Sequence, residues 1–121
     1  MTVREVAAAI GGAVVVGEAE CDRPVKGGYA SDLLSDVIAN AQDGDVWVTL
    51  QRHVNIVAVA HLKGLATIVL VNGRAPESDT IARAADEHLP IVTTPLEAFD
   101  VAGRLYGLGV RGRQIPASVH A

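Results

Sequence analysis

The stretch DVWVTLQRHVNIVAVAHLKGLATIVLVNGRAPESDTIARAADEHLPIVT, which spans residues 45–93, decides the fold. It contains three apolar runs of strand-like composition, which begin near residues 45, 66 and 90. Each run is followed by a segment of helical character, and the strands begin 21 and then 24 residues apart. This spacing is typical of βαβ units, which build a parallel sheet with helices packed on it.

The segment between the first two strands, residues 53–63, has conflicting signals. Its β-branched side chains favour a strand, whereas its length and the closing Lys63-Gly64 pair favour a helix. We predict a helix. The run 66–71 is apolar at nearly every position, as expected for a strand that is buried on both faces.

The residues before this stretch add further elements. Thr2 and Glu5 have the spacing of a capping box, which predicts a helix over 2–10. A β-branched run predicts a strand over 13–16, and residues 18–28 read as a loop that could hold a brief strand. Ser31 or Asp32 could cap a second helix, which would end near residue 41.

The residues after the second strand are predicted in the same way. Pro76 starts a helix that Pro90 ends, with an inner stripe of Ile81, Ala84, Ala85 and Leu89. Thr94 at the N-cap, Pro95 at the first position and Glu97 at the third predict a last helix. This helix is expected to bury Leu96, Phe99, Ala102 and Tyr106. The domain core is therefore predicted over residues 2–107, followed by a polar tail at 108–121.

Length and composition limit the function classes. The chain has 121 residues and a mass of 12.6 kDa, so we expect one domain over residues 1–121. Half of the residues are hydrophobic, which is enough for a core and excludes intrinsic disorder. The formal net charge of −4 argues against nucleic acid as a partner, because nucleic-acid binding depends on basic residues.

Cellular location follows from the single cysteine and the hydropathy pattern. Cys21 has no second cysteine to pair with, which fits a reducing cytoplasm. No apolar run approaches 18 residues and no charged-then-apolar leader is visible. We therefore predict a cytoplasmic protein without a membrane partner.

Catalytic and metal-binding signatures are missing from the sequence. The glycine-rich run 11–17 is followed by Glu18 where a phosphate-binding loop has lysine. His53 and His61 lie eight residues apart, which is about 12 Å along a helix and too far to share one metal ion. His88 closes a helix and His120 lies in the tail. The sequence thus predicts no enzyme activity, no metal site and no cofactor.

Polar side chains follow each predicted strand. Because the carboxyl ends of parallel strands meet at one edge of a sheet, these residues could form a site for a small anion or a nucleotide. Most of them could equally be ordinary caps and turns, although capping does not account for Gln51, Arg52 and His53. The candidate site residues are Ser31, Asp32, Gln51, Arg52, His53, Asn72, Gly73, Thr93 and Thr94.

The last predicted helix also carries a possible contact surface. Gly103 and Gly107 lie beside Arg104, and a face of small residues could admit a partner helix closely. Equally, the glycines could simply fray the end of the helix.

Four segments of the chain resemble the DRTGG domain family. They are 28–37 (GYASDLLSDV), 44–51 (GDVWVTLQ), 62–66 (LKGLA) and 70–73 (LVNG), and the resemblance extends from about Thr2 to Tyr106. It is especially close to stand-alone members encoded beside iron hydrogenase genes. The chain departs from both name-giving motifs: Gln51-Arg52-His53 stands in place of G-D-R, and Val71-Asn72-Gly73 in place of T-G-G.

The resemblance implies a fold and a type of function. The implied fold is a single layered α/β domain with a mainly parallel central sheet flanked by helices, similar to the N-terminal domain of HPr kinase/phosphorylase. The implied function is a non-enzymatic regulatory or assembly module that forms a homodimer and acts through a partner protein, such as a hydrogenase-related or other enzyme. The alternative hypothesis is a sensor that binds a nucleotide or phosphorylated metabolite at the strand-end loops.

Overall fold

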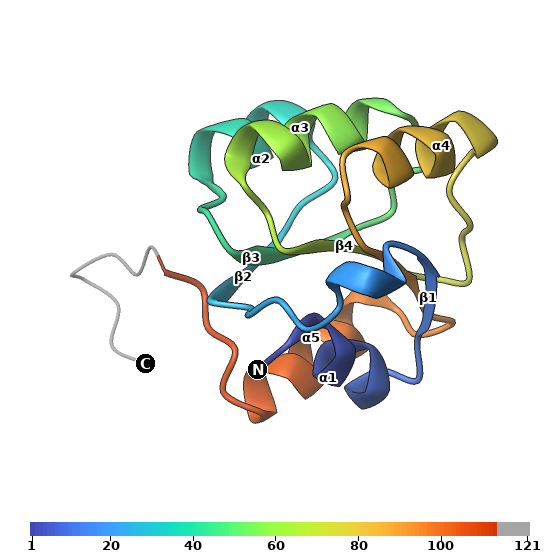
Figure 1. The fold of residues 1–121 in the computed structure, drawn as a ribbon. Helices are drawn as coiled ribbons and strands as arrows, with labels where there is room; N and C mark the ends of the chain where they lie inside the picture. The colour runs from blue at the N-terminus through green and yellow to red at the C-terminus, as the bar shows by residue number, and fades with distance from the viewer. Residues whose placement is uncertain (114–121) are drawn as a thin grey trace.

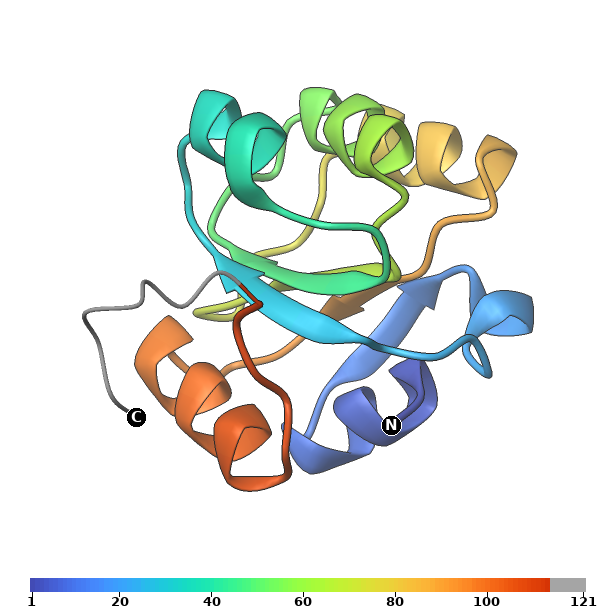
Figure 2. The same ribbon diagram turned by 90° about the vertical axis from the view of Figure 1, so that its left-hand side faces the viewer.

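The structure is a computed structural model of the chain, and it describes residues 1–113. A five-stranded sheet lies between two layers of helices, as Figures 1 and 2 show. Helices α2, α3 and α4 cover one face of the sheet, and α1 and α5 cover the other (Figure 1). The elements are α1 (Val3–Ala9), β1 (Ala13–Val16), the 3₁₀ turn η1 (Glu18–Glu20), β2 (Gly27–Ala30), α2 (Leu34–Asn40), β3 (Asp45–Thr49), α3 (Asn55–Lys63), β4 (Thr67–Leu70), α4 (Ser78–Asp86), β5 (Ile91–Thr93) and α5 (Ala98–Gly107).

The sheet is parallel except at one edge. Its strand order is β1-β5-β4-β3-β2, in which β2 to β5 run parallel and β1 pairs with β5 antiparallel. The register sets Trp47 of β3 beside Tyr29 of β2 and Ile68 of β4. The predicted parallel sheet with helical crossovers is therefore confirmed, and the four parallel strands all end at the same edge.

Successive side chains of the central strands point to opposite faces of the sheet and so belong to two separate parts of the core. Val46 and Val48 of β3 face α1 and α5, whereas Trp47 faces α2, α3 and α4. Every residue of β3 and β4 is buried, as expected for central strands covered on both faces. The Trp47 indole donates a hydrogen bond to the backbone carbonyl of Ser31 at 2.9 Å, which ties β3 to the end of β2.

Two predicted helices are confirmed in detail. The Thr2 hydroxyl accepts a hydrogen bond from the Glu5 amide, and the Glu5 carboxylate accepts one from the Thr2 amide, so the capping box is complete. Residues 55–63 form the helix α3 in spite of their β-branched side chains, and Gly64 ends it with a left-handed φ of 66°. The brief strand suggested before Tyr29 is β2.

The predicted start and inner face of the last helix are wrong. The helix α5 begins at Ala98, because Thr94 hydrogen-bonds elsewhere and Glu97 takes the N-cap position. The buried residues of α5 are Val101 and Leu105, and the residues expected to be buried are mostly outside. Of those four, Leu96 is half-buried, Ala102 is exposed, Tyr106 is 50% exposed and Phe99 is 85% exposed.

Smaller corrections apply to two other helices. On α4, Thr80 and Ala84 are buried, while Ile81 and Ala85 of the predicted stripe are exposed. The helix α2 begins at Leu34 with no side-chain cap, because the Asp32 carboxylate bonds to the end of β3 instead.

The chain after α5 returns to the sheet. The Gly28 amide donates to the Arg111 carbonyl at 3.0 Å, and the Arg113 guanidinium pairs with Asp45. The first part of the predicted tail therefore packs along β2, while residues 114–121, including His120, lie outside the described residues. Among residues 1–113, no helix is long and apolar enough to cross a membrane.

Candidate functional site

The candidate residues lie at the edge where the four parallel strands end. Ser31 and Asp32 follow β2, Gln51 follows β3, and the neighbouring ends of β4 and β5 carry Asn72-Gly73 and Thr93-Thr94. The Val71 amide donates to the Thr49 carbonyl at 3.3 Å, which joins the β3 and β4 ends. The topology thus gathers these residues along one edge of the sheet, as two neighbouring groups.

Asp32 is the centre of the first group. Its Oδ1 accepts hydrogen bonds from the Thr49 hydroxyl at 2.9 Å and from the Leu50 amide at 2.7 Å. The Gln51 side-chain amide donates to the Asp32 carbonyl at 2.9 Å, and the Ser31 hydroxyl accepts from the Leu33 amide. These contacts hold the loop after β2 against the end of β3.

The second group is built around the turn after β4. Asn72 and Gly73 have φ values of 59° and 68°, a left-handed conformation that glycine adopts freely and asparagine tolerates. The Gly73 amide donates to the Thr94 carbonyl at 2.9 Å, which joins this turn to the end of β5. The Thr94 side chain is 2% exposed, and its hydroxyl donates to the Ile10 carbonyl at 2.8 Å. Thr93 is the half-buried last residue of β5.

Arg52 and His53 are largely engaged by the backbone around them. The Arg52 guanidinium donates to the Ala75 carbonyl at 2.5 Å, and the Arg52 carbonyl accepts from the Thr80 hydroxyl at 2.7 Å. His53 Nδ1 accepts from the Asn55 amide at 3.2 Å at the start of α3. Both residues therefore help to fix the loop between β3 and α3.

A hollow remains beside the second group. Its volume is about 230 Å³, and it lies between the turn after α1 and the turn after β4. Arg74 is exposed there, and its guanidinium makes no hydrogen bond or ion pair with any of residues 1–113. The hollow is lined by Gly11, Ala13, Gly73, Arg74, Ala75, Thr93, Thr94 and Pro95. Three of the candidate site residues, Gly73, Thr93 and Thr94, thus line it together with Arg74.

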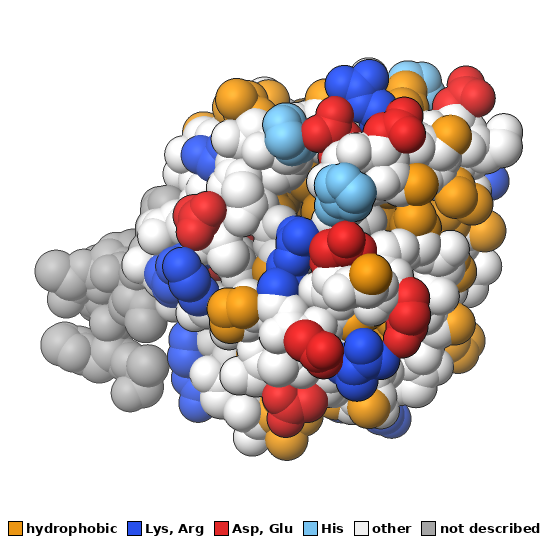
Figure 3. Space-filling model, in the orientation of Figure 1, with side chains coloured by type: hydrophobic (Ala, Val, Ile, Leu, Met, Phe, Trp, Pro, Cys, Tyr) orange, Lys and Arg blue, Asp and Glu red, His pale blue; other side chains and the backbone are white. Residues whose placement is uncertain are grey.

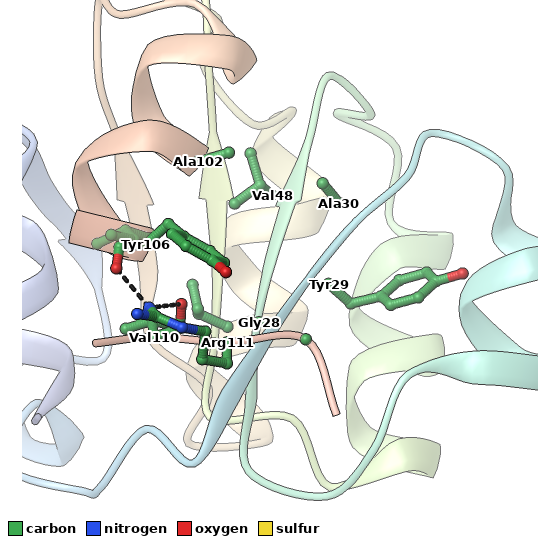
Figure 4. A pocket seen from close by; sticks show the side chains of 11 residues that line it. Gly28, Tyr29, Ala30, Val48, Ala102, Tyr106, Val110 and Arg111 are labelled. Carbon is green, nitrogen blue, oxygen red and sulfur yellow. Dashed lines mark hydrogen bonds between the residues drawn. The ribbon is translucent and has the colours of Figure 1, made fainter. Parts of the chain in front are cut away.

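A second, apolar pocket lies between α5 and β2. Its volume is about 120 Å³. Tyr106 and Arg111 close it by stacking, with the guanidinium 3.7 Å from the ring centroid (Figure 4). Tyr29 points the other way, toward α2, where its hydroxyl donates to the Asp36 carboxylate at 2.8 Å.

The titratable groups give little support for catalysis. Burial, with the charge of nearby Glu18, raises the pKa of the Cys21 thiol, so the reactive thiolate is disfavoured. Hydrogen bonds from Ser31, Tyr29 and Asn40 lower the pKa of Asp36. Within residues 1–113, no three His, Cys, Asp or Glu side chains come together in a way that could hold a metal ion.

The exposed face of α5 is the feature that the sequence prediction missed. Phe99, Tyr106 and Leu108 are large apolar residues that are at least half exposed. The alternative stripe of Val101 and Leu105, four residues apart, was the signal for the true inner face. Elsewhere, acidic and basic side chains are interspersed on the face shown in Figure 3.

Comparison with protein families identifies the domain. The model of the DRTGG domain matches residues 5–108, which is most of the chain. The chain belongs to the DRTGG domain family. The resemblance seen in four sequence segments is thereby confirmed. At the T-G-G position, Asn72 has a left-handed backbone, a conformation that glycine adopts freely.

One solved structure supports the fold of this DRTGG domain. It contains the CBS and DRTGG domains of the regulatory region of Clostridium perfringens pyrophosphatase, complexed with the activator diadenosine tetraphosphate. It matches with a TM-score of 0.68 and 13% sequence identity, over 86% of this chain and 45% of that chain. The chain thus spans less than half of that regulatory region, and at this identity the likeness shows the fold alone. The search of curated proteins gave no match.

Proposed function

We propose that this DRTGG domain is a cytoplasmic, non-enzymatic regulatory or assembly module that forms a homodimer and acts through a partner protein. The observation that carries the proposal is the contrast between two surfaces. The polar strand-end residues are mostly used within the fold, and among residues 1–113 no buried side-chain nitrogen or oxygen lacks a hydrogen bond. The large apolar side chains of α5 are instead left in solvent.

The DRTGG family and the similar solved structure support the same proposal. The C. perfringens structure is the regulatory region of an enzyme, and in it a DRTGG domain accompanies CBS domains. A regulatory module without enzyme activity of its own would reach its target by protein contact. An enzyme, such as a hydrogenase-related one, is the partner that we expect.

The homodimer is tested by sedimentation velocity of the full chain between about 1 and 200 μM, the range in which weak dimers dissociate. We expect a concentration-dependent shift from one to two copies. A single species of one copy over the whole range would reject the homodimer. The partner is tested by affinity capture from the source organism, with Phe99→Ser as the paired bait. An enzyme retained by the wild type and lost with the variant would support the proposal.

A second candidate function is a sensor for a nucleotide or phosphorylated metabolite at the strand-end loops. The observation in its favour is the hollow beside Arg74, where the exposed guanidinium is free to meet a phosphate. Arg52 is close to the same loops, although its guanidinium already bonds to the Ala75 carbonyl. The neighbouring regulatory region binds diadenosine tetraphosphate, which makes adenine nucleotides the first ligands to try.

The sensor function is tested by thermal shift with ATP, AMP, diadenosine tetraphosphate and pyrophosphate. A rise in melting temperature with one of them, lost in Arg74→Ala and reduced in Arg52→Ala, would support it. Arg83→Ala on α4 is the control, because Arg83 is exposed and lies outside the strand-end loops. No shift with any of the four compounds would reject this function.

A further inference from the structure

The outer face of α5 carries an exposed phenylalanine next to a glycine, which has no side chain. Phe99 is 85% exposed, and Gly103 lies four residues later on the same face of the helix. A Cβ atom at Gly103 would meet nothing within 4 Å, so the surface there is open. Figure 2 shows α5 at the outside of the molecule, and among residues 1–113 no other helix or strand lies over its outer side. A bulky apolar group from outside could therefore come close to this helix.

Charges flank this face in a defined order. Asp100 lies in the first turn of α5 and Arg104 in the last, and both are exposed. The Arg104 side chain makes one long hydrogen bond, 3.4 Å, to the Ala9 carbonyl, and the Asp100 carboxylate makes no hydrogen bond or ion pair with residues 1–113. Beside them is an open hollow of about 420 Å³, which is lined by Leu96, Phe99, Asp100, Gly103 and Arg104.

We propose that a second copy of this chain docks on this face, with the two α5 helices antiparallel about a two-fold axis. The Phe99 ring of each copy lies over Gly103 of the other, in the open hollow. Asp100 of each copy pairs with Arg104 of the other. The inference rests on the proposed homodimer and names the surface that forms it.

The order of charges selects this arrangement. A two-fold axis between antiparallel helices brings the same flank of each helix together with reversed direction, so that the first turn of one meets the last turn of the other. Asp100 then faces Arg104 twice. In a parallel pair the two-fold axis would run along the helices, and this flank of each helix would face the opposite flank of the other, so Asp100 would not meet Arg104 of the second copy. Each α5 is thus complementary to a reversed copy of itself.

The decisive experiment mixes two charge-reversal variants of the full chain. Asp100→Arg carries two positive charges on this flank, and Arg104→Asp carries two negative charges. Each variant alone opposes like charges in the dimer, so we expect its dimer dissociation constant to rise by at least about tenfold. An equimolar mixture restores both opposite-charge contacts, so we expect a mixed dimer at least as stable as the wild-type dimer. Sedimentation velocity and native mass spectrometry measure both results.

A matched control is available on α4. Asp79 and Arg83 are exposed, lie four residues apart and occupy the first and last turns of that helix, just as Asp100 and Arg104 do on α5. Asp79→Arg, Arg83→Asp and their mixture are expected to sediment as the wild type does. Phe99→Ser is compared in the same way with Leu62→Ser, which replaces a 69% exposed residue on the opposite layer. Thermal melting of each variant confirms that it is folded.

The possible results distinguish the proposed α5 surface from the existence of the homodimer. Loss of the dimer in both α5 variants, with recovery in the mixture and no effect of the α4 variants, supports the proposed surface. A wild-type dimer that the folded α5 variants leave intact overturns the surface and leaves the homodimer standing. A wild-type chain that remains a single copy overturns both. A dimer unaffected by Phe99→Ser, while the variant loses its partner enzyme, assigns this face to that enzyme and also overturns the proposal.

Discussion

Replacing Arg113 by alanine tests whether the chain after α5 is part of the domain. Arg113 Nε and Nη2 donate to Oδ1 of Asp45 at 3.0 and 2.6 Å, and Nη2 also donates to the Asp43 carbonyl. The Asp45 side chain is 4% exposed, and its other oxygen accepts from the Gln42 amide at 2.8 Å. Without Arg113, a buried carboxylate would keep one hydrogen bond and lose its counter-charge.

The expected loss is about 2 kcal/mol of unfolding free energy. Hydrogen bonds to charged groups contribute about 1.5–3 kcal/mol, and removing one partner of a fully buried ion pair costs about 3–5 kcal/mol. The lower part of these ranges applies, because Arg113 is 28% exposed and water can reach Asp45 once it is gone. For a domain of this size, the loss corresponds to a fall in melting temperature of about 8 °C.

Urea unfolding followed by Trp47 fluorescence measures the change, since Trp47 is the single tryptophan and is fully buried. Arg111→Ala is the control: its guanidinium contacts backbone carbonyls and the Tyr106 ring at the surface, and we expect a loss below about 1 kcal/mol. In an Asp45→Asn background, Arg113→Ala should cost less than it does in the wild type. If Arg113→Ala in the wild type stays within about 0.5 kcal/mol, the ion pair is not what holds this segment.

Three further predictions concern other parts of the chain. Cys21 is fully buried with a raised thiol pKa, so Ellman's reagent at pH 8 should label it only after urea unfolding; fast labelling of the folded chain would contradict the buried position. Gly17→Ala should cost at least about 2 kcal/mol of unfolding free energy, because φ is 81° at Gly17 and a Cβ there would lie 2.6 Å from Pro90 Cα. Gly103→Ala, where a Cβ would meet nothing within 4 Å, should instead raise the stability of the monomer by about 0.5–1 kcal/mol. Equal effects of the two substitutions in urea unfolding would refute this reasoning. The pKa of Asp36 is lowered in the folded chain, so the ionised Asp36 carboxylate stabilises the fold above its ordinary pKa of 3.8, and this stabilisation is lost as pH falls through the lower folded pKa. The stability difference between wild type and Asp36→Asn should therefore be constant from pH 8 to 5 and shrink below about pH 4. A difference independent of pH down to 3 would be the contrary result.

The order of strands and helices was predictable because each depends on short-range patterns. Residues 66–71 are apolar at successive positions, and Thr2 with Glu5 closes a capping box within one turn. Even the ambiguous segment 53–63 was resolved by its length and by Gly64, whose left-handed backbone ends the helix. The parallel direction of neighbouring strands was predictable too, since the 21- and 24-residue spacings leave room for a helix between them.

The orientation of α5 was not predictable in this way. Thr94 has the composition of an ideal N-cap, but its hydroxyl bonds to the Ile10 carbonyl, a residue 84 positions away, and the helix starts at Ala98. Val101 and Leu105 face inward, in the core cluster that contains Val46 and Val48 of β3, and Phe99 and Tyr106 are turned outward. The surface proposed for dimerisation thus follows from a contact between α1 and β5 that no local pattern contains.

The sequence by itself determined the layered α/β architecture and the edge at which polar residues gather, because hydrophobic periodicity and strand spacing are local properties of the chain. Only the tertiary structure decided which of those polar side chains remain available to bind a ligand. Asp32, Thr94 and Arg113 are paired with groups 18, 84 and 68 residues distant, and such pairings depend on where the backbone brings distant carbonyls, amides and carboxylates together. A side chain that completes the fold in this way has fewer groups left to bind a ligand.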